Sequence, residues 1–113
     1  MTVQTLIDRQ IARLVNEGDS MGREIEKVFC CDLLSIAMGR APTGCAWVTV
    51  MANLNTLAVA SLADVSCVIL AEGFHMDENG VQKAKMQGIT LLETDKPVFD
   101  AALEIYQVLE AES

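Results

Sequence analysis

Two short apolar runs constrain the fold of this chain most. Residues 45–51 (CAWVTVM) and 65–71 (VSCVILA) contain no charged side chain, and uninterrupted apolar runs of this length are typical of strands buried on both faces. Between them lies an apolar segment that predicts a helix running to about Ala63, and either Asn53 or Asn55 can cap it. Buried strands that alternate with helices predict a largely parallel sheet covered on both sides.

The remaining segments continue this alternation. Apolar patterning predicts strands near residues 11–16, 23–30 and 89–93, and helices over 2–10, 33–39, 78–87 and from Pro97 onward. Asp32 and Asp77 are placed to cap helices, and Gly88 to end one. Apolar side chains surround the axis of the 54–63 helix, so we expect it to be covered on most sides.

The length and composition fit one folding unit. The chain has 113 residues, 51% of them hydrophobic, which suits one compact domain with a single core. We therefore expect a single α/β domain over residues 1–113, with a mostly parallel sheet of about five strands and helices on both faces.

The charge of the chain and the lack of targeting signals count against nucleic-acid binding, membrane association and secretion. The net charge of −8 counts against nucleic-acid binding, which relies on clustered lysine and arginine. Residues 41–63 are uncharged, but Pro42, Gly44 and several polar residues interrupt them, so we expect no membrane association. Residues 1–10 lack the apolar core of a secretory signal. This indicates a cytoplasmic protein with free thiols.

Polar residues recur where the predicted strands end. Ligands of open parallel sheets bind beyond the carboxyl ends of the strands, where helix N-termini also present free amides. Asp32, Asn53 and Asp95 also suit ordinary helix caps, so both interpretations stay open for them. The candidate ligand-binding residues at this edge are Asp32, Thr49, Asn53, Asn55, Gly73, Thr94 and Asp95.

Few patterns in the chain indicate catalysis. Cys30 and Cys31 directly precede a predicted helix, where the helix dipole lowers thiol pKa, so they are redox candidates. Cys45 and Cys67 lie in core strands and are expected to act as small apolar residues. His75 is the single histidine, and a solvated or turn role is expected for it. Phosphate-binding and nucleophile-elbow motifs are missing, so we expect no enzyme, cofactor or metal site.

The last predicted helix carries two apolar stripes. One stripe suits the core, and the second consists of Phe99, Leu103 and Tyr106 at helical spacing. An apolar stripe of this kind either packs inside the domain or faces a partner. We expect it to form a self-association surface, which makes the protein a homodimer.

A recognisable pattern runs through segments 31–35 (CDLLS), 46–50 (AWVTV), 53–55 (NLN), 58–64, 68–73 and 85–95. Together these segments resemble a stand-alone DRTGG-like domain, similar to the N-terminal, non-kinase domain of HPr kinase/phosphorylase. The resemblance covers roughly residues 2–106, although residues 53–56 read NLNT where the naming signature stands. It implies an α/β fold, frequent dimerisation and a regulatory or ligand-sensing role. Similar short proteins accompany iron-only hydrogenase and other anaerobic redox genes, which implies a redox-linked partner.

Three function hypotheses follow from the sequence. The leading one is a non-enzymatic regulatory module that binds a small polar metabolite, a nucleotide or a partner protein at the carboxyl edge of the sheet. The second is a redox-active or catalytic thiol protein that uses Cys30 or Cys31. The third is a structural dimeric adaptor that acts through its last helix.

Overall fold

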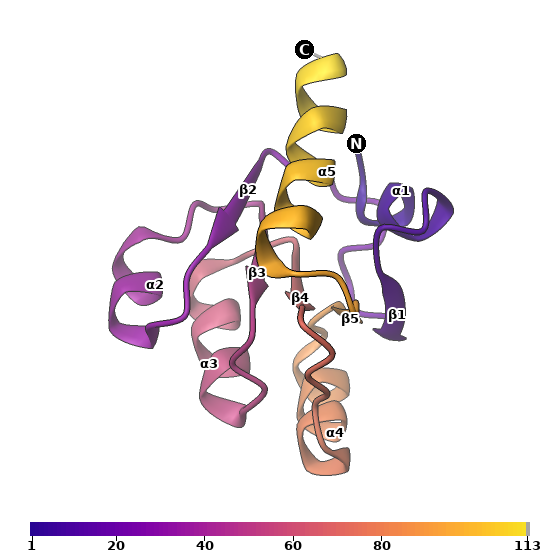
Figure 1. The fold of residues 1–113 in the computed structure, drawn as a ribbon. Coiled ribbons are helices and arrows are strands. Elements are labelled where there is room, and N and C mark those ends of the chain that lie inside the picture. Colours follow the sequence, from indigo (N-terminus) through magenta and orange to yellow (C-terminus); the bar gives the residue numbers. More distant parts are fainter. Residues whose placement is uncertain (113) are drawn as a thin grey trace.

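A single five-stranded sheet organises the protein, whose computed structural model describes residues 1–112. The strand order across the sheet is β1-β5-β4-β3-β2 (Figure 1). β2 to β5 are mutually parallel, whereas β1 pairs antiparallel with β5. The expected mostly parallel sheet is confirmed, with one antiparallel edge strand. The strands are β1 (Arg13–Asn16), β2 (Lys27–Cys30), β3 (Cys45–Thr49), β4 (Cys67–Leu70) and β5 (Leu91–Glu93).

Helices cover both faces of this sheet, as expected (Figure 1). From β2 to β5 the chain steps across the sheet in one direction, and right-handed crossovers then place the connecting helices on one face. These helices are α2 (Leu34–Arg40), α3 (Leu54–Ala63) and α4 (Glu78–Gln87). The opposite face is covered by α1 (Val3–Asp8) and α5 (Val98–Ala111).

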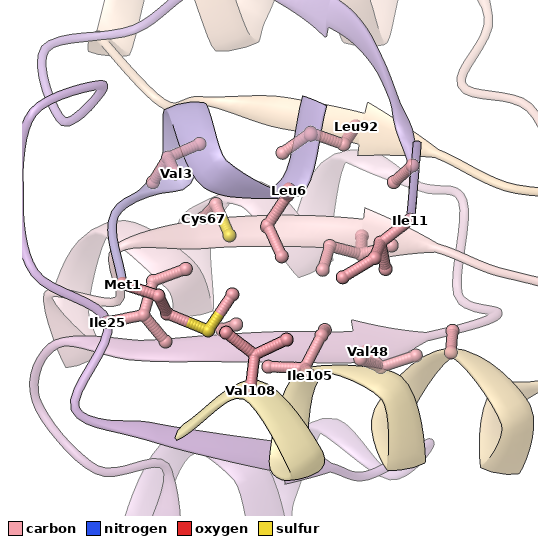
Figure 2. Close-up of a cluster of buried hydrophobic side chains, with 14 of the residues drawn as sticks. Met1, Val3, Leu6, Ile11, Ile25, Val48, Cys67, Leu92, Ile105 and Val108 are labelled. Carbon is pink, nitrogen blue, oxygen red and sulfur yellow. The ribbon is translucent and has the colours of Figure 1, made fainter. Parts of the chain in front are cut away.

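Alternate residues of the buried strands divide the core into two clusters. Val48 and Ile69 face α1 and α5, where they meet Leu6 and Ile105 (Figure 2). Trp47, Val68 and Leu70 face the other three helices. This division explains why residues 45–51 and 65–71 show no polar alternation: both faces of β3 and β4 are fully buried.

Most of the predicted helix ends are confirmed. The Asn53 side chain accepts a hydrogen bond from the Thr56 amide at 3.1 Å, and Asp77 accepts one from Gly80 at 2.8 Å. Gly88 ends α4 in the left-handed conformation, with φ 68°. The prediction that Asp32 caps α2 is wrong. Leu33 occupies the cap position without a side-chain hydrogen bond, because the Asp32 carboxylate instead binds Thr49 and Val50.

Two further expectations need correction. The strand predicted over 23–30 starts only at Lys27, because its one neighbour, β3, begins at Cys45, which is opposite Lys27. The helix over 54–63 is less covered than expected, since Leu62 is 75% exposed and Leu54 48% exposed. Neighbouring helices α2 and α4 flank α3, and its outer side faces solvent. Within residues 1–112, no helix is long and apolar enough to cross a membrane.

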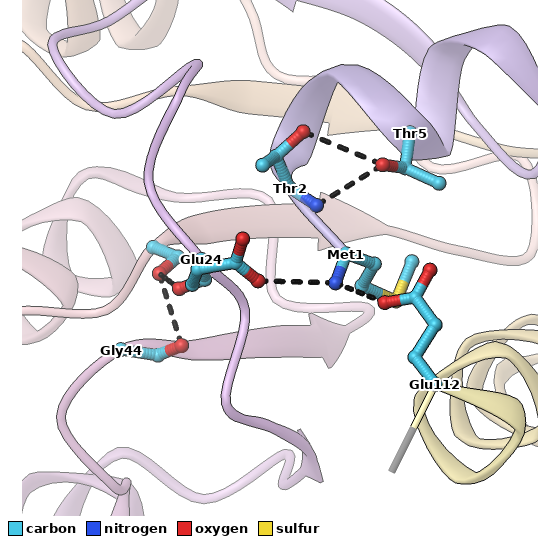
Figure 3. A network of polar contacts seen from close by, with 7 residues as sticks. Met1, Thr2, Thr5, Glu24, Gly44 and Glu112 are labelled. Carbon is cyan, nitrogen blue, oxygen red and sulfur yellow. Dashed lines mark hydrogen bonds and ion pairs between the residues drawn. The ribbon is translucent and has the colours of Figure 1, made fainter.

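The N-terminal segment is attached to the domain by polar contacts. The Met1 amino group donates to Glu24 at 3.1 Å and also to Glu112 at the end of α5 (Figure 3). These hydrogen bonds, that to Glu112 foremost, raise the pKa of the amino group. The Ser66 hydroxyl donates to the Gly44 carbonyl at 2.9 Å, next to this network. Residues 1, 24 and 112 are therefore held together at one end of the domain.

Candidate functional site

The connections that leave β4 and β5 diverge. The chain passes from β4 into α4 on one face, and from β5 into α5 on the opposite face. In open α/β sheets, a crevice forms at the carboxyl ends of neighbouring strands whose connections leave to opposite faces, and ligands bind there. From β2 to β4 the connecting helices share one face, so topology places this crevice at β4 and β5.

Three of the four predicted residues at the β3 side of the edge already bind other groups of the protein. The Thr49 hydroxyl donates to the Asp32 carboxylate at 2.7 Å, and the Val50 amide donates to the same oxygen at 3.1 Å. Asn53 caps α3. Asn55 is exposed in the first turn of α3 and makes no side-chain hydrogen bond within residues 1–112. Their roles as ligand contacts stay predictions.

The predicted residues at the β4 and β5 side come together at the crevice. Gly73 follows β4 with φ 78°, and its amide donates to the Thr94 carbonyl at 3.1 Å. A side-chain carbon at Gly73 would lie 3.6 Å from Asp95 Oδ1. The Thr94 hydroxyl accepts a hydrogen bond from the Lys96 amide at 3.2 Å. Gly73, Thr94 and Asp95 therefore form one contiguous part of the edge.

A buried carboxylate lies at the centre of this part. Glu93, the last residue of β5, is only 6% exposed. Among residues 1–112, it is the only residue with a charged side chain that is buried. Its Oε2 accepts a hydrogen bond from the Met76 amide at 3.1 Å, and its Oε1 lies 2.7 Å from His75 Nδ1. The His75 ring is 62% exposed. A carboxylate that binds one ring nitrogen orients the imidazole and leaves the other nitrogen available.

Arg13 connects this buried carboxylate to the surface. Its Nη2 lies 3.6 Å from Glu93 Oε1 and 3.6 Å from Asp95 Oδ1. Both separations exceed a normal hydrogen bond, so the guanidinium is attracted to the two carboxylates without tight pairing. The Arg13 side chain is 48% exposed and that of Asp95 is 81% exposed. One cation and one anion thus stand side by side at the surface.

A groove of about 430 Å³ adjoins this pair. One wall consists of Ile7 from α1, Ile11 and Ala12 from the connection, and Leu14 from β1. The turn after β5 forms the other. Lys96 closes one end, because its Nζ donates to Glu104 at 2.6 Å and to the Gln10 carbonyl at 3.2 Å. The groove combines an apolar wall with a charged rim, as small-molecule sites do.

Sequence reasoning missed Arg13 and Glu93, and it assigned His75 only a solvated or turn role. A signal for Glu93 existed, because a glutamate that directly follows Leu91 and Leu92 in a buried strand is exceptional. No sequence signal pointed to Arg13, since only the antiparallel pairing of β1 with β5 places it opposite Glu93. Within residues 1–112, no group of three or more His, Cys, Asp or Glu side chains is arranged to hold a metal ion.

The thiols differ from expectation in one respect. Cys45 and Cys67 are buried in the core, as predicted, and burial raises the pKa of Cys45 to about 12 and also raises that of Cys67. Cys30 is exposed, yet partial desolvation and the neighbouring Asp32 and Cys31 raise the pKa of its thiol. The lowering expected from the start of α2 is therefore wrong for Cys30. The Cys31 thiol donates to the Leu33 carbonyl at 3.3 Å.

We expect iodoacetamide at neutral pH to modify the folded protein only at Cys30 and Cys31. Cys30 should react more slowly than a free cysteine peptide, because its raised pKa lowers the thiolate fraction. Cys45 and Cys67 should react only in denaturant, since they are buried. Intact-mass spectra over time measure the adducts. A third adduct under native conditions, or Cys30 reacting faster than the peptide, would contradict this picture.

The second apolar stripe of the last helix is exposed, as a self-association surface requires. Phe99 is 69% exposed, Tyr106 51% and Leu103 38%. The core-facing stripe is confirmed, because Ala101, Ile105 and Val108 of α5 are buried. The homodimer stays a prediction.

Neither the protein-family models nor the curated proteins contain a match to the chain.

Proposed function

We propose that this protein is a non-enzymatic regulatory or ligand-sensing module that binds a small polar metabolite at the carboxyl end of β5. The observation that carries the proposal is the loosely paired Arg13 and Asp95, which border a groove of about 430 Å³. Asp95 follows β5, one of the two strands at the crevice where sheets of this topology bind ligands. Arg13 lies on β1, so the groove adjoins this crevice from the β1 side of β5.

The groups at the edge favour binding over catalysis. Arg13 offers guanidinium donors, and Asp95 offers carboxylate acceptors, in a groove that has an apolar wall. Such groups orient a ligand by hydrogen bonds and charge. The resemblance to DRTGG-like domains supports the same regulatory role, and it further suggests a cytoplasmic homodimer with a partner in anaerobic redox metabolism.

Thermal-shift screening with nucleotides, organic acids, amino acids and sugars tests the proposal. A binder at about 100 times its Kd should raise Tm by roughly 10 °C, because binding to the folded state alone adds about 2.7 kcal/mol to stability. The shift should disappear in Arg13→Gln. It should persist in Arg40→Gln, since Arg40 is exposed at the end of α2, far from the groove.

Two outcomes would refute the proposal. One is a screen in which no compound raises Tm. The other is a shift of equal size in wild type and Arg13→Gln, which would locate binding elsewhere.

A further inference from the structure

We propose that the groove beside Arg13 and Asp95 binds a free α-amino acid with an aliphatic side chain. This inference rests on the proposed function and names its ligand class. It combines three features of the groove: its paired surface charges, the neutral balance of its rim and its apolar wall.

The surface charges match a zwitterion. Arg13 Nη2 and Asp95 Oδ1 are 3.6 Å apart, so each retains unused hydrogen-bonding capacity. A ligand carboxylate can bind the Arg13 guanidinium in the two-pronged geometry that arginine favours. A ligand ammonium can then bind the Asp95 carboxylate, which is 81% exposed. An α-amino acid carries these two groups on one carbon atom, which suits two adjacent charges.

The zero net charge of the groove lining disfavours ligands that carry a net charge. Arg13 and Lys96 oppose Glu93 and Asp95, so the charged residues that line the groove sum to zero. Lys96 is also held by Glu104 and the Gln10 carbonyl. A phosphate or a dicarboxylate would bring two negative charges next to Glu93 and Asp95 without a second available cation. A neutral zwitterion meets no such repulsion.

Glu93 and His75 prepare Arg13 for this role. The buried carboxylate is held by the Met76 amide and the His75 ring, and it attracts the guanidinium from the interior side. This attraction favours a guanidinium position next to the groove before a ligand arrives, which lowers the entropic cost of binding.

The apolar wall of the groove favours an aliphatic side chain on the ligand. Ile7, Ile11, Ala12 and Leu14 line it. Ile11 and Ala12 are buried, so the apolar surface open to a ligand is that of Leu14, which is 38% exposed, and of the half-buried Ile7. An aliphatic side chain that covers Leu14 and Ile7 would remove apolar surface from water. The volume of about 430 Å³ falls within the range of small-ligand pockets.

Calorimetric titration with L-leucine tests the inference, with two analogues that each lack one charge. We expect saturable binding of L-leucine. Binding of 4-methylpentanoate, which lacks the ammonium, and of isoamylamine, which lacks the carboxylate, should be weaker by about tenfold or more, because each loses a charged hydrogen bond. Asp95→Asn should weaken L-leucine binding to a similar extent. Asp100→Asn, at an exposed position in the first turn of α5, should leave it unchanged.

The outcomes separate this inference from the proposed function. Equal affinity for L-leucine and 4-methylpentanoate would overturn the zwitterion assignment. If L-leucine, L-valine and L-methionine all fail to bind while another metabolite gives an Arg13-dependent thermal shift, the amino-acid class is wrong and the binding module stands. If no compound binds in either experiment, both proposals fail. Because the Asp95 side chain is 81% exposed, Asp95→Asn should fold normally, and circular dichroism verifies this.

Discussion

Gly18→Ala is expected to destabilise the protein by about 3–4 kcal/mol, the largest effect we expect from a single methyl group. A Cβ at Gly18 would lie 2.4 Å from the Gly88 carbonyl oxygen and 2.5 Å from backbone atoms of Ile89 and Thr90. Since all three are backbone atoms, no side-chain rotation can relieve the overlap. The two segments must separate.

That separation would also break contacts that the end of β1 and the turn after it make with the segment joining α4 to β5. The Asp19 amide donates to the Gly88 carbonyl at 2.9 Å, and the Asn16 side chain donates to the Ile89 carbonyl at 2.8 Å. Urea denaturation followed by circular dichroism should show a midpoint lower by roughly 2 M.

Two other glycines provide matched controls. Gly22 and Gly39 have no heavy atom within 4 Å of a built Cβ. Gly22→Ala should change stability by less than about 0.5 kcal/mol. Gly39→Ala should add about 0.5–1 kcal/mol, because Gly39 lies in α2 and alanine favours a helix. A Gly18→Ala midpoint equal to that of Gly22→Ala would show that the two segments are not in contact.

Glu93→Ala is expected to reduce stability by about 2–3 kcal/mol and to disorganise the candidate site. The substitution leaves the buried Met76 amide without its acceptor and frees the His75 ring. Arg13 also loses its interior partner and keeps only Asp95. Urea denaturation measures the loss of stability. Because His75 is the only histidine, its ring signals in an NMR spectrum report the change at the site without further assignment.

Glu17→Ala is the control for this experiment. Glu17 is exposed and makes no side-chain hydrogen bond or ion pair within residues 1–112, so its removal should cost less than about 0.5 kcal/mol. Equal stability of the two variants, or His75 ring signals unchanged by Glu93→Ala, would contradict the contacts assigned to Glu93.

The position of the candidate site was only partly predictable. The carboxyl edge of the sheet was expected, and Gly73, Thr94 and Asp95 do come together there. The same reasoning treated every strand end alike, because it used no strand order. Only the observed order shows that the connections diverge at β4 and β5. The Asp32–Thr49 contact shows that polar groups on the β3 side bind each other.

Local patterns by themselves determined the class of fold and most helix ends. Apolar runs identify buried strands, and Asn53, Asp77 and Gly88 act on backbone groups within four residues of themselves, so neighbouring sequence suffices to predict them. Tertiary structure alone decided what lies at the groove. Arg13 and Glu93 are 80 positions apart and meet because β1 adds antiparallel to β5. Asp32 bound Thr49, 17 positions away, in preference to the nearby helix. Contacts of this kind depend on strand order and register, which are set by packing of the whole core.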